Sequence, residues 1–190
     1  QENFLGERFE RALLYATRLH EKQRRKRSEV PYIAHLLGVT ALVLEDGGDE
    51  DEAIAALLHD AVEDQGGLET LETIRGDYGE KVAGIVLELS DSYQQPKPPW
   101  RERKEAYIAS LGDSSPGAVR VSLADKVYNA RSTLEDLRRE GEAAWNKFNG
   151  GKAGTLWYYG ELITAFSLHG QNPLLSELER VVERIRILTN

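Results

Sequence analysis

Residues 56–64 read ALLHDAVED, an apolar helical pattern that ends in an imidazole and three carboxylates. Burial of an unpaired charge is costly, so buried charged groups are usually paired with one another or bound to a metal. On a helix, residues four positions apart lie nearly above one another, which places His59 over Glu63 and Asp60 over Asp64. The spacing predicts a pair of metal ligands, His59 and Asp60, with an acid–base pair, Glu63 and Asp64, one turn further along the helix.

A metal site needs more than two protein ligands, and two other segments of the chain offer candidates. His35 lies in the apolar run PYIAHLLGV, and Asp125 lies in VSLADKVYNARS, where Asn129 and Ser132 follow on the same helical stripe. A set of two histidines and two aspartates without a thiolate suits Mn, Fe, Zn or Mg. Taken alone, His35 could be a hydrogen-bonded core histidine, and the Asp125 stripe could be a solvated helix face.

The chain is acidic, with a formal net charge of −8 at pH 7. This balance disfavours long nucleic acid as a partner, because affinity for nucleic acid comes mainly from Lys and Arg contacts to phosphates. The cations are nevertheless clustered in residues 22–27 (KQRRKR) and 97–104 (KPPWRERK). Local positive patches on an acidic protein favour a small polyanionic ligand, although either run alone could also be a solvated loop.

The composition is that of a globular protein, and the length fits a single domain over residues 1–190. The absence of cysteine excludes disulfides and thiolate metal sites and is compatible with a reducing compartment. The absence of methionine indicates a trimmed or processed N-terminus. The first residues lack the pattern of a signal peptide, and no apolar run is long enough to span a membrane. We therefore expect a cytoplasmic protein that does not bind membranes.

Hydrophobic spacing near 3.6 residues predicts helices along almost the whole chain, and no segment alternates with period two for long. The predicted helices cover residues 9–19, 33–44, 49–64, 68–79, 80–89, 100–111, 115–141 and 172–188. The Ser-Pro pair at 115–116 and the Asn-Pro pair at 172–173 are typical of helix starts, and residues 147–154 predict an irregular connection. The pattern predicts an all-α fold, with His20 and His169 at the surface or at helix ends.

Three motifs, RKRSEVPYIAHLLGV, AALLHDAVED and VSLADKVYNARS, occur in this order at residues 25–39, 55–64 and 121–132. Together they resemble the HD-domain hydrolases of the alarmone (p)ppGpp, above all the small single-domain proteins of the Mesh1 type and the hydrolase half of the long Rel/Spo enzymes. The later segment WNKFNGGKAGTLWYYGEL is similar to small bacterial members, so the resemblance spans roughly residues 10–165. It implies a single-domain helical HD-domain bundle.

The resemblance also implies a metal site and a substrate site. One Mn²⁺ ion would be held by His35, His59, Asp60 and Asp125. The attacking water would be oriented and deprotonated by Glu63 and Asp64. The positions that match contacts to the nucleotide in the family are Lys26, Arg27, Ser28, Tyr32, Lys104, Asn129, Ser132, Lys152 and Tyr158.

Three positions depart from the family pattern. Leu36 follows the predicted ligand His35, where the family commonly has proline. The helix predicted over residues 33–44 could therefore begin differently. The basic loop reads Lys26–Arg27 where the order Arg-Lys is usual, which could alter stacking on the base. Gly160 stands where an arginine is frequent, and this concerns the phosphate contacts and not the metal site.

The implied activity is Mn-dependent hydrolysis of the 3′-diphosphate of ppGpp or pppGpp, which releases pyrophosphate and GDP or GTP. One alternative keeps the site but changes the substrate, for example to the 2′-phosphate of NADPH or to an adenosine alarmone. Another alternative is a non-catalytic nucleotide-binding regulator, although such a domain usually loses a metal ligand or the base. The sequence leaves open the oligomeric state, the metal loaded in the cell, the preferred nucleotide, and a role in stress signalling or toxin neutralisation.

Overall fold

In the computed structural model of the chain, residues 5–90 and 96–189 are described, and most of them lie in helices. The α-helices are α1 (Glu7–Leu19), α2 (Ile33–Glu45), α3 (Glu50–Leu58), α4 (Ala61–Asp64), α5 (Gly67–Tyr78), α6 (Glu80–Leu89), α7 (Trp100–Ser110), α8 (Pro116–Glu140), α9 (Gly151–Ser167) and α10 (Pro173–Leu188). Short 3-10 helices, η1 (Leu111–Asp113) and η2 (Gly141–Lys147), follow α7 and α8. An isolated β-bridge joins Arg24 to Pro31. The predicted all-α fold is confirmed.

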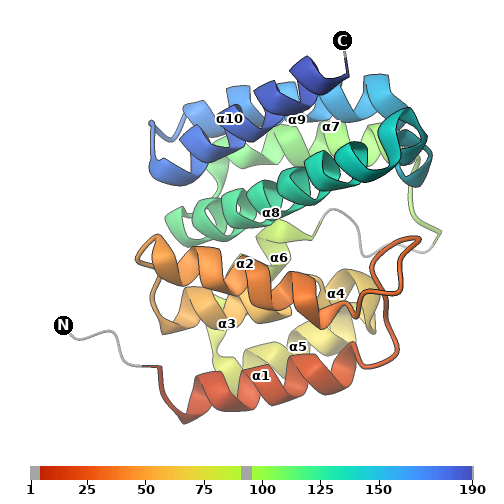
Figure 1. Cartoon of the computed structure of the whole chain (residues 1–190). Coiled ribbons are helices and arrows are strands. Elements are labelled where there is room, and N and C mark those ends of the chain that lie inside the picture. The colour runs from red at the N-terminus through yellow and green to blue at the C-terminus, as the bar shows by residue number, and fades with distance from the viewer. Residues whose placement is uncertain (1–4, 91–95, 190) are drawn as a thin grey trace.

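The long helix α8 runs between two groups of helices (Figure 1). On one side it packs against α2, α3 and α6, and on the other side it packs against α10 and η2. Helix α1 packs on α3 and α5 packs on α6, whereas α9 lies between α7 and α10. Because α8 contacts both groups, its side chains can meet residues that are far apart in the sequence.

After its acidic first turn, helix α3 is apolar on all sides and is buried among α1, α2, α6 and α8. Residues 53–58 have no exposed surface, and α1, α2, α6 and α8 all contact this helix. A helix that is hydrophobic all round is typically buried in a core. Although α3 is apolar, neither it nor another helix in the described part of the chain is both long and apolar enough to cross a membrane. Packing on every side therefore fixes the C-terminal end of α3, which His59 and Asp60 follow.

The prediction of one continuous helix over residues 49–64 is wrong. Helix α3 ends at Leu58 and α4 begins at Ala61, so His59 and Asp60 lie in a turn between them. The imidazole Nδ1 of His59 donates to the carbonyl of Ala56 at 2.7 Å, and this carbonyl is the acceptor that Asp60 would use in a continuous helix. Asp60 has φ −96° and ψ −1°, in the sparsely populated region where many active-site residues occur.

The predicted starts of two later helices are confirmed, but one helix was missed. Ser115 accepts a hydrogen bond from the N–H of Ala118 at 3.3 Å, and Asn172 accepts one from Leu175 at 2.9 Å. Helix α9 begins at Gly151, inside the stretch that the sequence predicts as irregular. The GGKAG segment is typical of a loop, and only the packing of α9 between α7 and α10 makes it helical.

Helices α2 and α8 approach each other closely at Gly38. A Cβ atom at this position would collide with the ring of Tyr128, which projects from α8. The ring of Tyr128 in turn meets the ring of His35 edge-on, with a distance of 5.0 Å between centroids. The glycine therefore lets an aromatic side chain of α8 press against His35 and limit its rotation.

An ion pair ties α3 to the start of α8. Glu52 is only 6% exposed, and both of its carboxylate oxygens accept hydrogen bonds from Nη1 of Arg120 at 2.8 Å. Nε of Arg120 donates to Asp46 at 2.9 Å. Glu52 also completes a capping box with Asp49 at the start of α3. The pair thus holds α3, which ends next to His59, against α8, which carries Asp125.

We expect Arg120→Met to destabilise the fold, because it leaves the buried carboxylate of Glu52 without a charged partner. The expected loss is about 3 kcal/mol, the lower end for a broken buried pair, since Arg120 is partly exposed. Urea denaturation measures this loss. Arg138→Met is the matched control, because Arg138 forms an exposed pair with Glu135 and its loss should stay within about 0.5 kcal/mol. Equal losses in both variants would contradict the structural role of the Glu52–Arg120 pair.

Candidate metal centre

Side chains from three separate segments meet where the two helix groups adjoin. His35 comes from the first turn of α2, His59 from the turn between α3 and α4, and Asp125 from the middle of α8. All three residues are buried, and one potential ligand atom of each lies within 4.8 Å of the others. Oδ1 of Asp125 lies 3.1 Å from Nε2 of His35 and 3.6 Å from Nε2 of His59. These three residues form a candidate site for a divalent metal.

Asp60 adds a second carboxylate to this cluster. Its Oδ2 lies 3.1 Å from Nε2 of His59 and 3.6 Å from Nε2 of His35. The same oxygen accepts a hydrogen bond of 2.6 Å from the hydroxyl of Tyr32, which holds the carboxylate in place. The structure thus brings the four predicted ligands together, and ligation by Asp60 stays a prediction.

The donor set fits a divalent cation. His59 donates from Nδ1 to the carbonyl of Ala56, so the lone pair of its Nε2 faces the cluster. This Nε2 is buried and has no hydrogen-bond partner among the described residues, although two carboxylate oxygens lie within 3.6 Å. Ligand atoms about 2.1 Å from a metal are separated by about 3.0–3.4 Å from their neighbours. Two of the four observed nitrogen–oxygen separations, 3.1 Å each, fall in this range, and the other two, 3.6 Å each, lie just above it.

The pKa shifts within the cluster also indicate a cation site. Burial opposes ionisation of His59, but Asp60 and Asp125 hold the pKa of its imidazole well above the usual range. Burial also opposes ionisation of Asp60, yet the two histidines hold the pKa of this carboxyl well below its ordinary value. The pKa of Asp125 is likewise lowered well below its ordinary value against the effect of burial, by Lys126 first and then by the histidines. The cluster therefore favours positive charge between its carboxylates, which a divalent cation supplies.

Two further side chains hold Asp125. Lys126 donates to Oδ2 at 2.7 Å, and the amide of Asn129 donates to Oδ1 at 2.8 Å. Asn129 in turn accepts a hydrogen bond of 3.0 Å from the guanidinium of Arg25. This chain of contacts connects the candidate metal ligand to the basic segment that precedes α2.

Glu63 and Asp64 lie beside the cluster, in the wall of a cavity of about 200 Å³ that also contains the four predicted ligands. Oε1 of Glu63 pairs with Nζ of Lys97 at 2.8 Å, and Oδ2 of Asp64 accepts a hydrogen bond of 2.8 Å from Gln23. Burial, followed by the charge of Asp60, raises the pKa of Asp64. The geometry is compatible with an acid–base pair, and the catalytic roles of Glu63 and Asp64 remain predictions.

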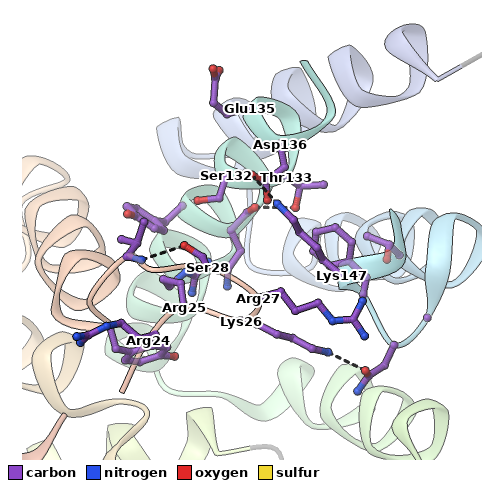
Figure 2. A pocket seen from close by; sticks show the side chains of 18 of the residues that line it. Arg24, Arg25, Lys26, Arg27, Ser28, Ser132, Thr133, Glu135, Asp136 and Lys147 are labelled. Atoms are coloured by element: carbon purple, nitrogen blue, oxygen red, sulfur yellow. Dashed lines mark hydrogen bonds and ion pairs between the residues drawn. The ribbon is translucent and has the colours of Figure 1, made fainter. Parts of the chain in front are cut away.

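A larger cavity of about 940 Å³ adjoins the smaller one. One wall is the basic loop, which we define as residues 24–31 and which the Arg24–Pro31 bridge closes. Figure 2 shows Arg25, Lys26 and Arg27 of this loop opposite Ser132, Thr133 and Asp136, which follow one another along α8. The cavity is therefore a cationic space that runs along α8 away from the metal cluster.

Most of the predicted nucleotide contacts line this larger cavity. The predicted residues in its wall are Lys26, Arg27, Ser28, Tyr32, Lys104, Asn129, Ser132 and Tyr158. Among the described residues, Lys152 lines neither of the two cavities. Its amine instead contacts the carbonyl of Thr189 and the carboxylate of Glu142. The structure thus brings eight of the nine predicted residues together and places Lys152 elsewhere.

Arg25 is the residue of the basic loop that lines both cavities, and the sequence interpretation missed it. Its side chain lines both cavities, and its guanidinium lies 5.9 Å from the ring centroid of Tyr32 and 5.8 Å from that of Tyr128. The order Arg-Lys, which the resemblance describes as usual, is present at residues 25–26. Reading the pair one position earlier would have found Arg25.

The prediction that His20 lies at the surface or at a helix end is confirmed for the helix end. The residue lies at the C-terminal end of α1, as predicted, but it is buried and only 2% exposed. Its ring stacks on Tyr32, with 5.3 Å between centroids. His169 is exposed at the end of α9, as predicted. The apolar spacing of α1 gave no signal for His20, because the rings that cover it come from another segment.

Comparison with known proteins agrees with this geometry. Residues 12–156 match the HD domain family. The Homo sapiens protein guanosine-3′,5′-bis(diphosphate) 3′-pyrophosphohydrolase MESH1 is 40% identical over 136 residues, which are 70% of this chain and 71% of that protein. The Drosophila melanogaster protein of the same name is 34% identical over 143 residues, which are 74% of this chain and 75% of that protein.

A solved structure is similar over almost the whole chain. It is described by the statement that a metazoan orthologue of SpoT hydrolyses ppGpp and plays a role in starvation responses. The TM-score is 0.78 at 28% identity, and the alignment covers 96% of this chain and 97% of the other. With most of its length matched to the family and the histidines and aspartates of its motifs gathered at one site, this chain belongs to the HD-domain family.

Proposed function

We propose that this protein is a guanosine-3′,5′-bis(diphosphate) 3′-pyrophosphohydrolase, which converts ppGpp or pppGpp to GDP or GTP and pyrophosphate. The observation that carries the proposal is the position of the His35–His59–Asp125 cluster beside a large cationic cavity. A cluster alone would suit many phosphate esters, whereas the adjoining cavity adds room for a nucleoside. The names of the similar proteins give the same substrate.

The positions of the two cavities suggest which part of the substrate binds in each. The side chains common to both walls are Arg25, Tyr32, Asp64, Lys104, Asn129 and Tyr158. We place the 3′-diphosphate in the small cavity beside the metal ligands and the guanosine in the large cavity between the basic loop and α8. Lys104 lies at the junction, with its amine 5.2 Å from the ring centroid of Tyr158, where it can neutralise the phosphates.

The residues of the site then have separate tasks. The chemistry that a divalent cation supplies when bound is polarisation of a phosphoryl oxygen and a lower pKa for water. Glu63 accepts the proton of the attacking water, and its ion pair with Lys97 orients the carboxylate. Attack at the phosphorus next to the 3′ oxygen breaks the O3′–P bond, and the 3′ oxygen takes the proton that Glu63 removed from water, so the products are pyrophosphate and GDP or GTP with a free 3′-hydroxyl. Asp64 assists Glu63 by holding the water or sharing its proton.

Three finer points belong to the same proposal. Manganese is the metal that we propose, because imidazole and carboxylate ligands without a thiolate suit it. The protein acts as one domain over residues 1–190. Its location is the cytoplasm, since the proposed substrate is made and used inside the cell.

We expect the purified protein with Mn²⁺ to release pyrophosphate and GDP from ppGpp, and we expect EDTA to abolish the release because the reaction needs a divalent cation. The measurement is product analysis by anion-exchange chromatography across ppGpp, pppGpp, an adenosine analogue and NADPH. Release of orthophosphate from NADPH, without pyrophosphate from ppGpp, would instead favour the phosphatase alternative.

Two substitutions should separate metal binding from turnover. Asp60→Ala removes a predicted ligand and should abolish Mn²⁺ binding in a calorimetric titration. Glu63→Gln should keep Mn²⁺ binding but lower kcat by roughly 10²–10⁴-fold, since the amide cannot accept the proton of water. If metal-loaded Glu63→Gln turned over at the wild-type rate, Glu63 would not be the base.

The missed residue Arg25 should contribute mainly to substrate binding. Arg25→Met removes a charge from both cavity walls, so KM for ppGpp should rise by about tenfold or more, as expected for a charge-assisted contact. Lys22→Met is the matched control from the same basic run, because Lys22 is exposed and lies outside both cavity walls. Equal KM values for the two variants would remove Arg25 from the substrate site.

A further inference from the structure

Gln23 lies at the base of the basic loop, where the chain leaves α1 and approaches the metal centre. Its backbone N–H donates to the carbonyl of His20, and its carbonyl accepts a hydrogen bond from the N–H of Tyr32, each at 3.0 Å. The hydroxyl of Tyr32 donates to Asp60 at 2.6 Å. The backbone of Gln23 is thus held both to the end of α1 and to the residue that orients a predicted metal ligand.

The side-chain amide of Gln23 makes three contacts that determine which of its atoms faces Asp64. Nε2 donates to Oδ2 of Asp64 at 2.8 Å. Oε1 accepts a hydrogen bond from Gln65 at 2.9 Å and lies 2.6 Å from Nδ1 of His20. Because an amide oxygen cannot donate, donors on Oε1 leave the N–H of Nε2 for the carboxylate.

His20 determines the orientation of this amide from the interior of the protein. Its Nε2 is buried and has no hydrogen-bond partner in the described part of the chain, so the proton belongs on Nδ1, which faces Gln23. His20 is not one of the described residues that line the two cavities. Its influence on the site therefore passes through Gln23 and not through contact with a ligand.

Asp64 needs this support because its own helix is very short. Helix α4 spans only Ala61–Asp64, so Asp64 is its last residue and only a single helical turn restricts its side chain. Gln65 follows with an extended φ of −139°. A hydrogen bond from outside the helix is thus the contact that selects one orientation of the carboxylate.

We propose that Gln23 and His20 are positioning residues that hold the carboxylate of Asp64 toward the reacting water. The proposal rests on the proposed function, in which Asp64 assists Glu63. Gln23 makes the contact with Asp64, and His20 orients the amide of Gln23 by occupying its oxygen. Neither residue ligates the metal, so loss of the pair should lower turnover and leave metal binding intact.

The test uses the full chain loaded with Mn²⁺ and measures kcat and KM for pyrophosphate release from ppGpp. Gln23→Leu removes the donor and should lower kcat by roughly 10–100-fold, while KM and Mn²⁺ affinity stay within about threefold. His20→Phe keeps the stacking on Tyr32 but removes Nδ1–H, and it should lower kcat by roughly tenfold. His20→Asn restores a donor near the position of Nδ1 and should recover most of the activity.

The double variant His20→Phe/Gln23→Leu shows whether the two residues act in one chain of contacts. Its kcat should equal that of Gln23→Leu, because His20 has no route to Asp64 once the amide is gone. A double loss equal to the product of the single losses would overturn the linkage, and wild-type kcat in Gln23→Leu would overturn the proposal. His169→Phe is the matched control, since the ring of this exposed histidine donates to the carbonyl of Leu111 and, among the described residues, His169 lines neither cavity at the cluster, so the variant should keep wild-type kcat.

A structural measurement separates this inference from the proposed function. If the wild-type protein released no pyrophosphate, the proposed function would fail, and the kinetics would not report on Asp64. Crystal structures of the wild type and of Gln23→Leu still decide the positioning role. We expect the Asp64 carboxylate to turn away in the variant while the four predicted metal ligands stay in place. An unmoved Asp64 would overturn the proposal.

Discussion

The approach of two imidazoles to two carboxylates is the interaction on which the rest of this structure depends. His35, His59, Asp60 and Asp125 lie with their nitrogen and oxygen atoms 3.1–3.6 Å apart, and they are buried or nearly so. In such a place the cluster requires additional positive charge, because like charges on the carboxylates would otherwise repel in a medium that screens poorly. The packing of helices α2, α3 and α8 brings these four side chains together and thereby creates the need for a cation there.

Three of the four members of the cluster, His59, Asp60 and Asp125, are each held by a hydrogen bond to a residue outside the cluster. The carbonyl of Ala56 orients His59, the hydroxyl of Tyr32 orients Asp60, and the amide of Asn129 orients Asp125. The residues just outside the metal site thus decide its geometry, as is usual for protein metal centres. Gln23 extends this pattern to Asp64, which lies beyond the cluster. The segment between α1 and α2 supports both Asp60 and Asp64, since it carries Tyr32 as well as Gln23.

The distribution of charge explains how an acidic protein offers a site to a polyanion. The cations of the basic loop face the cavity, whereas the carboxylates further along α8 are paired with other cations. Asp136 contacts both Arg139 and Lys147, and Lys147 also contacts Glu140. These pairs limit the repulsion that the acidic residues in the cavity wall would exert on phosphate groups. Net charge describes the whole surface, but a ligand responds to the local field.

The sequence by itself determined the helical class and most helix ends, because hydrophobic period and capping residues are local properties of the chain. Its motifs also pointed to the four predicted metal ligands, which the structure brings together, and to the pair Glu63–Asp64, whose catalytic roles remain predictions. Tertiary structure alone decided what depends on distant contacts. Helix α9 forms over a glycine-rich start because it packs between α7 and α10, and the helix around His59 breaks where the imidazole takes a backbone acceptor. Arg25 lines both cavities, His20 is buried against Tyr32, and among the described residues Lys152 lines neither cavity, because side-chain direction depends on which other segment packs against it. No spacing along the chain specifies that neighbour.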